Sequence, residues 1–212
     1  MKRTIGFLFL VAISAMAFVL PVEELKTLSI GDVAPLADRK MMAVDGKEYS
    51  LNDLKQENGI VVVFSCNTCP FVVGSDNFVG WEGQYNLLAN RASAVKMGFV
   101  LVNSNEAKRG GDDSLEAMKK RAAEKGYVMP YVTDNQHELA DACGAKTTPH
   151  VYVFDKEMKL IYTGAIDNTV DGKRKQDEPF LLNAIQEYLG GNPVKQAVTP
   201  PRGCSIKRVV KQ

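Results

Sequence analysis

The sequence has little of several features that mark common protein classes. Its 26 basic and 25 acidic residues leave a formal charge of only +1, so the basic surface of a nucleic-acid-binding protein is not indicated. Four cysteines in 212 residues are too few for a disulfide-stapled scaffold. No internal repeat is present. With 45% of its residues hydrophobic, the chain is expected to form one substantial core, as a single domain with extensions.

The sequence also lacks an apolar run as long as a typical membrane span. A short basic start is followed by sixteen uncharged residues, 5–20, whereas a spanning helix needs about 20 apolar residues. Together with the A-x-A pattern at Ala15-Met16-Ala17, this predicts a secretory signal peptide over residues 1–17. The alternative is an uncleaved anchor to about residue 20, with membrane association. We expect an exported, periplasmic or otherwise extracytoplasmic protein, where disulfides persist.

The most informative stretch is an apolar run followed by two cysteines. Residues 60–64 are β-branched and aromatic, which is typical of a buried strand. Ser65 ends the run, and Cys66 and Cys69 follow, separated by two residues, before Pro70. Because proline is well tolerated in the first turn of a helix, we expect a helix to begin there. Its N-terminal N–H groups and partial positive charge favour a thiolate.

This position makes the cysteine pair a candidate redox couple. We expect Cys66, nearest the strand end, to attack a disulfide, and Cys69, one turn into the helix, to resolve the mixed disulfide. Asn67 and Thr68 are accessory candidates, since the intervening dipeptide helps to set the redox properties of such a pair. A structural disulfide and half of a zinc site are the alternatives, but no second pair of ligands is spaced for zinc.

The rest of the chain predicts an α/β fold with a central mixed β-sheet, helices on both faces and an N-terminal β-hairpin. The predicted elements are a hairpin over 41–51 about Asp45-Gly46, a helical turn at 51–54, strand 60–64, helix 70–92 with a bend at its glycines, strand 98–103, helix 115–125, strand 130–132, helix 136–143, a hairpin of strands 151–154 and 160–164, and helix 179–189. Residues 104–113 and 167–178 are expected to be solvated loops. The domain is assigned to residues 28–192, and the tail, 193–212, is expected to be loosely ordered except around Cys204.

A second motif, Thr147-Thr148-Pro149-His150, begins the predicted hairpin about 80 residues after the cysteines. The order of strand, C-x-x-C, helix and a later Thr-Pro resembles the thioredoxin superfamily. The resemblance implies a thioredoxin-like fold in which Pro149 is cis and lies against the cysteine pair. It also implies that the backbone of Thr148 faces Cys66 and binds an extended substrate.

Further segments are similar to the exported redoxin branch of that superfamily, the thiol-specific antioxidant (AhpC/TSA) and TlpA-like proteins. These segments are Gly31-Asp32-Val33-Ala34-Pro35, Asp45-Gly46 and Leu51-Asn52-Asp53-Leu54. Three others resemble the peroxiredoxin-like thioredoxin family proteins, namely Ser65-Cys66-Asn67-Thr68-Cys69-Pro70, Val102-Asn103-Ser104-Asn105 and Gly203-Cys204-Ser205-Ile206-Lys207. The resemblance covers about residues 28–207.

The sequence departs from the best-known patterns of these proteins. Ser65 stands in place of the tryptophan of W-C-G-P-C, Asn67-Thr68 in place of Gly-Pro, and Ile60 in place of the buried acid. In the peroxiredoxin pattern P-x-x-x-T-x-x-C, Val62 and Cys66 would occupy the proline and threonine positions. This argues against peroxidase activity by the peroxiredoxin mechanism.

Other residues are weaker candidates. Cys143 shares a helix face with apolar neighbours, which favours a small buried hydrophobe. Cys204 is either a third redox thiol that reaches the pair or a solvent-exposed residue. Glu106 is the nearby acid that we would assign to proton transfer. His150 either touches the site or is an ordinary strand histidine, and His137 is expected on a helix surface.

The leading hypothesis is therefore an exported thiol–disulfide oxidoreductase without a resident cofactor or metal. Its partners would be protein or small-molecule disulfides and a thiol reductant or oxidant, with no nucleic acid. One alternative is a thiol-dependent peroxidase or antioxidant protein. Another is a binding module in which Cys66, Cys69 and His150 hold Cu(I), which soft thiolates select. Copper chaperones of similar fold use C-x-x-x-C-P, one residue longer than the spacing here.

Overall fold

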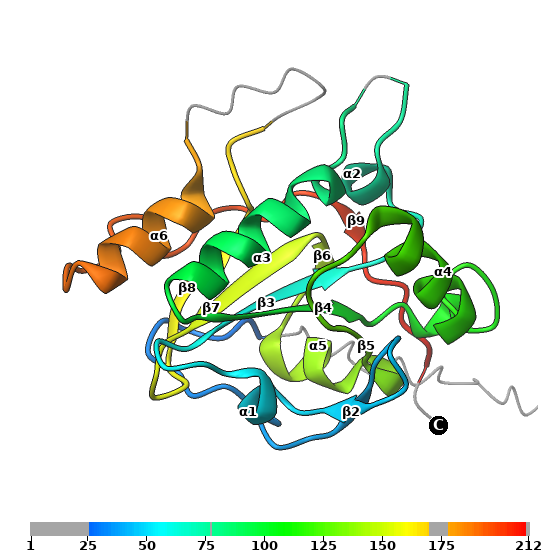
Figure 1. The fold of residues 1–212 in the computed structure, drawn as a ribbon, viewed down its shortest axis with the longest axis horizontal. Coiled ribbons are helices and arrows are strands. Elements are labelled where there is room, and N and C mark those ends of the chain that lie inside the picture. Colours follow the sequence, from blue (N-terminus) through cyan, green and yellow to red (C-terminus); the bar gives the residue numbers. More distant parts are fainter. Residues whose placement is uncertain (1–25, 77, 170–177, 211–212) are drawn as a thin grey trace, which may run out of the picture.

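The computed structural model describes residues 26–76, 78–169 and 178–210, and Figure 1 shows their arrangement. The strands are β1 (Met41–Met42), β2 (Glu48–Tyr49), β3 (Ile60–Ser65), β4 (Gly98–Asn103), β5 (Tyr131–Thr133), β6 (Thr147–Thr148), β7 (His150–Phe154), β8 (Leu160–Gly164) and β9 (Cys204–Ser205). The α-helices are α1 (Leu51–Leu54), α2 (Pro70–Val73), α3 (Tyr85–Ala94), α4 (Leu115–Lys125), α5 (Glu138–Cys143) and α6 (Phe180–Leu189). Short 3-10 helices are η1 (Trp81–Gln84), η2 (Glu106–Lys108) and η3 (Asn135–His137). The predicted signal peptide lies outside the described residues.

The centre of the molecule is a mixed five-stranded sheet in the order β5-β4-β3-β7-β8. Strands β3, β4 and β5 run parallel, while β7 is antiparallel to both β3 and β8. The predicted N-terminal hairpin forms as β1 and β2. Two further strands, β6 and β9, make a separate antiparallel pair. The predicted fold class is confirmed.

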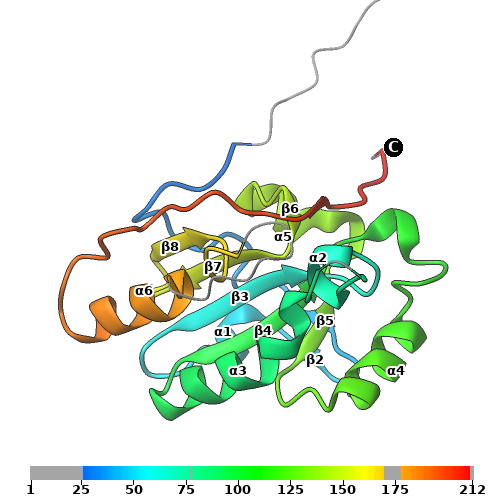
Figure 2. The same ribbon diagram turned by 90° about the horizontal axis from the view of Figure 1, so that it is seen from above.

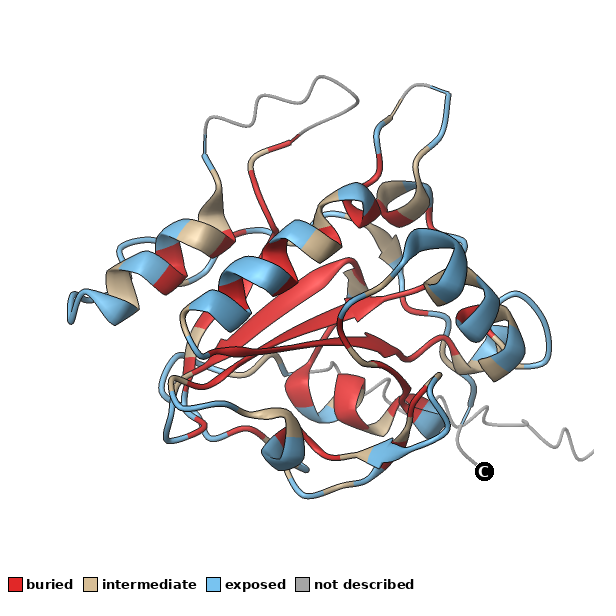
Figure 3. Cartoon of the chain, in the orientation of Figure 1, coloured by how far each residue is buried: buried red, intermediate tan, exposed pale blue. Residues whose placement is uncertain are grey.

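Both faces of the sheet are covered, so every residue of β3, β4, β5 and β7 is buried (Figure 3). Along β3 the side chains alternate, as a strand requires. Val61 and Val63 pack into a core shared with α3 and α6. Val62 and Phe64 pack into a second core, shared with α1 and α5. A continuous apolar run is the expected signature of a strand buried on both sides.

The predicted helix over 70–92 is wrong in its continuity. The chain forms α2, leaves it at Gly74 and starts again at η1 and α3. Gly74 has φ +91°, which favours glycine. A Cβ added to Gly80 would lie 2.1 Å from the carbonyl oxygen of Val72, so the returning chain packs directly on α2. Of the three glycines expected to bend the helix, Gly74 and Gly80 lie at a break in it, and Gly83 lies within η1.

Two regions expected to be exposed are packed instead. Asp167 is buried and accepts hydrogen bonds from the Trp81 indole at 2.8 Å and the Gln84 amide at 2.9 Å; residues 170–177 of that predicted loop lie outside the described ones. The expectation that the tail is loosely ordered, except around Cys204, is wrong for residues 193–202 and 206–210. Figure 2 shows this segment running from α6 along β8 and β6, and it bridges Val198 to Thr163 and pairs β9 with β6.

In the part of the chain that the structure describes, no helix is both long and apolar enough to cross a bilayer.

Candidate active site

The two cysteines lie where β3 leaves the sheet. Ser65, the last residue of β3, is buried and its hydroxyl shares a hydrogen bond of 3.0 Å with the Tyr85 hydroxyl. Pro70 begins α2, as predicted, and Cys69 is the N-cap of that helix, not one turn into it as expected. The Cys69 N–H points at the Cys66 sulfur, 3.3 Å away. Both thiols are free and both side chains are buried, with exposed fractions of 3%.

The Thr-Pro motif meets this pair across 79 and 82 residues of sequence. The Thr148–Pro149 peptide bond is cis, as the resemblance implied. The Thr148 side chain shares a hydrogen bond of 3.2 Å with the Cys66 sulfur. Its carbonyl oxygen accepts a hydrogen bond from the Cys69 thiol at 3.1 Å. Thr148 therefore contacts both sulfurs, its hydroxyl at Cys66 and its carbonyl at Cys69.

The contacts make the two thiols ionise as a unit. A hydrogen bond from Cys66 lowers the pKa of Cys69 to about 5, against the effect of burial, and the N–H groups of Cys204 and Phe71 act in the same direction. The same shared hydrogen bond, with burial, raises the pKa of Cys66, while the Thr148 hydroxyl opposes the rise. Because the remaining proton is shared between the sulfurs, the pair loses its first proton well below the usual range of a thiol.

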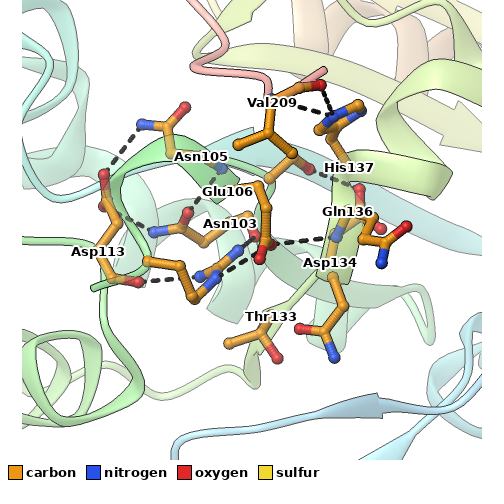
Figure 4. Close-up of polar contacts among 12 residues, drawn as sticks. Asn103, Asn105, Glu106, Asp113, Thr133, Asp134, Gln136, His137 and Val209 are labelled. Atoms are coloured by element: carbon orange, nitrogen blue, oxygen red, sulfur yellow. Dashed lines mark hydrogen bonds and ion pairs between the residues drawn. The ribbon is translucent and has the colours of Figure 1, made fainter. Parts of the chain in front are cut away.

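Asn67, between the cysteines, is held by a buried carboxylate. Its N–H donates to Asp113 at 2.8 Å, and its side-chain oxygen accepts from the Tyr131 hydroxyl at 3.0 Å. Figure 4 shows Asp113 also receiving the side-chain amides of Asn103 and Asn105, at 2.7 and 3.0 Å. The carboxylate lies close enough to Cys66 to contribute to the rise of its pKa. Asp113 therefore fixes the loop that carries both thiols.

The role of Asp113 at the site was not predicted from the sequence, which placed this residue in a solvated loop. The available signals were its position before the cap of α4 and two asparagines, Asn103 at the end of β4 and Asn105 just after it. Ser114 does cap α4, accepting from the Ala117 N–H at 3.2 Å. The other dipeptide residue, Thr68, is exposed. It lines a surface hollow with Asn67, Lys120 and Arg121.

Glu106 and the two histidines contact other parts of the chain. Glu106 pairs with Arg109 at 3.5 Å and accepts the Gln136 N–H at 3.1 Å (Figure 4), and no contact with the cysteines accompanies these among the described residues. Of the two expectations for His150, the ordinary strand histidine is confirmed, and its side chain is buried. Its ring nitrogens meet the Lys146 N–H and the Thr163 hydroxyl, and burial lowers its pKa to about 3.

Two smaller expectations have opposite outcomes. The expectation that His137 lies on a helix surface is wrong. The residue is 3% exposed and shares hydrogen bonds with Asp141 at 2.8 Å and with the Val209 backbone. The expectation that Cys143 is a small buried residue is confirmed, since its exposed fraction is 1%. Burial raises the pKa of its thiol. Within the described ranges, no group of three or more His, Cys, Asp or Glu is placed to hold a metal ion.

The chain is similar to a known family and to several solved structures. A family model described as Redoxin matches residues 29–179. A solved structure of an uncharacterized conserved protein from Geobacillus kaustophilus is 34% identical, with a TM-score of 0.74, and the match covers 87% of this chain and 94% of that one. A hypothetical protein from Sinorhizobium meliloti 1021 is 27% identical, with a TM-score of 0.75 and coverage of 88% and 98%. No curated protein matches.

A more distant structure shares the fold alone. A putative thiol:disulfide interchange protein DsbE from Chlorobium tepidum is 21% identical, with a TM-score of 0.56 and coverage of 77% of this chain and 100% of that one.

Proposed function

The chain belongs to the redoxin family of the thioredoxin superfamily, and we propose that it is a thiol–disulfide oxidoreductase whose redox couple is Cys66 and Cys69. One observation carries the proposal. Both sulfurs lie against Thr148, and the Cys69 N–H reaches the Cys66 sulfur at 3.3 Å. A dithiol with a shared proton and a lowered first pKa is the reactive form in disulfide exchange.

Within the couple we propose that Cys66 attacks and Cys69 resolves. The Thr148 carbonyl, 3.1 Å from the Cys69 sulfur, favours the proton on Cys69. When the shared proton moves there, Cys66 becomes the thiolate, supported by the Cys69 N–H and the Thr148 hydroxyl. It attacks one sulfur of the substrate disulfide, and the electron pair leaves on the other sulfur. Cys69 then attacks Cys66, which releases the reduced substrate and leaves a Cys66–Cys69 disulfide.

We also propose that the protein acts outside the cytoplasm, on disulfides of proteins or small molecules, with an electron-carrying thiol partner. The support is the basic, apolar and A-x-A sequence of residues 1–17.

No group other than the thiols is required for the exchange. In the Cu(I) alternative His150 would be the third ligand, but both of its ring nitrogens are already occupied by hydrogen bonds.

The test is reduction of insulin disulfides by dithiothreitol, with Cys66→Ser, Cys69→Ser and Cys143→Ala compared with the unaltered chain. Catalysis should fall by at least about 100-fold in the first two variants, which lose a member of one catalytic unit, and should persist in Cys143→Ala. Retained turnover in Cys66→Ser would contradict the proposal. The same proteins assayed with a hydroperoxide and excess dithiol test the peroxidase alternative, which requires peroxide consumption that depends on these thiols.

Trapping tests the order of attack. With oxidised glutathione, Cys69→Ser should stall as a mixed disulfide on Cys66, because the resolving thiol is missing. Glutathione retained on Cys69 of Cys66→Ser, and not on Cys66 of the other variant, would reverse the order.

A further inference from the structure

The C-terminal segment lies at the strand edge that ends in the cis proline. Strand β9 pairs antiparallel with β6, and Cys204 stands directly opposite Thr148 in that register. Figures 1 and 2 both show β9 beside β6. Thr148 itself contacts both Cys66 and Cys69. Cys204 is therefore brought to the dithiol by the residue that forms the other half of the site.

The close approach depends on the residue before Cys204. A Cβ added to Gly203 would lie 2.1 Å from the Thr148 carbonyl oxygen, a distance that no side chain tolerates. Glycine thus lets the two backbones meet at the cysteine pair.

Cys204 lies against one particular sulfur of the pair. Its N–H donates to the Cys69 sulfur at 3.3 Å. The two side chains also interact, because a hydrogen bond from the Cys204 thiol contributes to the low pKa of Cys69. Cys69 therefore has a thiol neighbour on either side, Cys66 and Cys204.

The segment is anchored beyond β9 as well. Ile206 is buried and its N–H donates to the Lys146 carbonyl at 3.1 Å. The Lys207 N–H donates at 2.8 Å to Asn105, which binds the Asp113 carboxylate (Figure 4). These contacts hold Cys204 at the pair instead of leaving it in solvent.

We propose that Cys204 is a third redox thiol, which exchanges with the Cys66–Cys69 disulfide to form a Cys69–Cys204 disulfide. The step rests on the proposed function, which produces the first disulfide. The Cys204 thiolate attacks the Cys69 sulfur, the Cys66–Cys69 bond breaks, and its electron pair leaves on Cys66, which takes up the proton that Cys204 lost. No net oxidation occurs, and Cys66 is restored as a thiol.

The electrostatics of Cys204 suit this order. Burial, and then the hydrogen bond and charge of Cys69, raise the pKa of Cys204 to about 11, while Lys207 lowers it. Once Cys69 is in a disulfide it carries no charge, so it no longer raises the pKa of Cys204, while Lys207 still lowers that pKa. The thiolate of Cys204 therefore forms more readily after Cys66 and Cys69 have been oxidised than before.

The experiment uses the full chain in glutathione redox buffers, with Cys66→Ser and Cys69→Ser as matched variants. Trypsin releases Cys204 in the peptide 203–207, the cysteine pair in 56–91 and Cys143 in 126–146. In Cys66→Ser we expect peptide 203–207 joined to 56–91, with Cys143 left free. The effective concentration for this disulfide should exceed that for Cys66–Cys204 in Cys69→Ser by at least about tenfold, or about 30 mV. Equal values, or no linked peptide in Cys66→Ser, would overturn the proposal.

A second pair of variants leaves both thiols of the proposed disulfide, Cys69 and Cys204, in place. In the Cys66→Ser background, Gly203→Ala should reduce formation of the linked peptide, because its methyl group displaces β9 from Thr148. Gly83→Ala is the control, since its added Cβ meets nothing within 4 Å. If Cys66→Ser does not fold, Cys66→Ala replaces it. Insulin reduction by the unaltered chain separates the two claims: activity without a Cys69–Cys204 link overturns only the third thiol, whereas inactivity overturns the function itself.

Discussion

The cysteine pair and Cys143 are both buried, with exposed fractions of 3%, 3% and 1%, yet the pKa of Cys69 is lowered while that of Cys143 is raised. Cys143 ends α5 among apolar side chains of the core. Burial, and then the charge of Asp134, raise its pKa. The pair lies at a strand–helix junction, where the Cys69 N–H has no helical partner and points at the Cys66 sulfur. The Cys204 N–H of β9 points at the Cys69 sulfur. Burial removes water from all three thiols, and the polar groups that replace the water decide whether a thiolate forms.

The largest expected difference between these regions is in alkylation of the reduced protein. Loss of thiol from the pair should follow one ionisation with a midpoint near pH 5, the value to which the pKa of Cys69 is lowered. The rate should rise with pH through this midpoint and then level off, because the thiolate is the nucleophile. At pH 7 Cys143 should react at least about 1,000-fold more slowly.

Rates are measured by tandem mass spectrometry, which also identifies the sulfur that reacts. A midpoint near pH 9 for the pair, or an equal alkylation rate for Cys143, would show that the two regions do not differ in thiol acidity.

The next effect concerns the carboxylate that holds the loop of the pair. Asp113→Asn replaces one acceptor oxygen by a donor that faces the N–H groups of Asn67, Asn103 or Asn105. We expect the free energy of unfolding to fall by about 1–3 kcal/mol, measured by urea denaturation. Asp112→Asn is the matched control, because Asp112 is exposed and meets Asn67 through its backbone carbonyl. Its change should stay within about 0.5 kcal/mol. Equal losses in both variants would mean that Asp113 does not anchor the loop.

The smallest effect concerns Cys143 itself. Cys143→Ala removes one buried sulfur and leaves a small cavity, so the free energy of unfolding should fall by about 1 kcal/mol. The pH midpoint for alkylation of the pair should not move. A shifted midpoint would show that the two regions are coupled, contrary to their separate positions in the fold.

Much of the fold was predictable because its signals are local. The apolar run of β3 appears where its residues predict it, and helix α4 has the predicted bounds, 115–125. The turn at Asp45-Gly46 likewise joins β1 and β2. The helix from Pro70 was predicted too long, because its apolar spacing does not reveal that Gly80 packs on the backbone of Val72. In the candidate site, the strand–helix junction that carries Cys66 and Cys69 was predictable from neighbouring residues, whereas the position of Thr148-Pro149 against them was implied only by the family resemblance.

By itself the sequence determined the mixed sheet, the strand–helix junction with its two thiols, and the presence of a Thr-Pro motif, which the family resemblance placed against them. Only the tertiary structure decided what surrounds each sulfur. The Asp113 contact with Asn67 spans 46 residues, and the Cys204 contact with Cys69 spans 135. A pKa depends on donors and charges within a few ångströms, whatever their distance along the chain. The dithiol is therefore encoded locally, while its acidity and its third thiol neighbour arise from the folding of distant segments onto it.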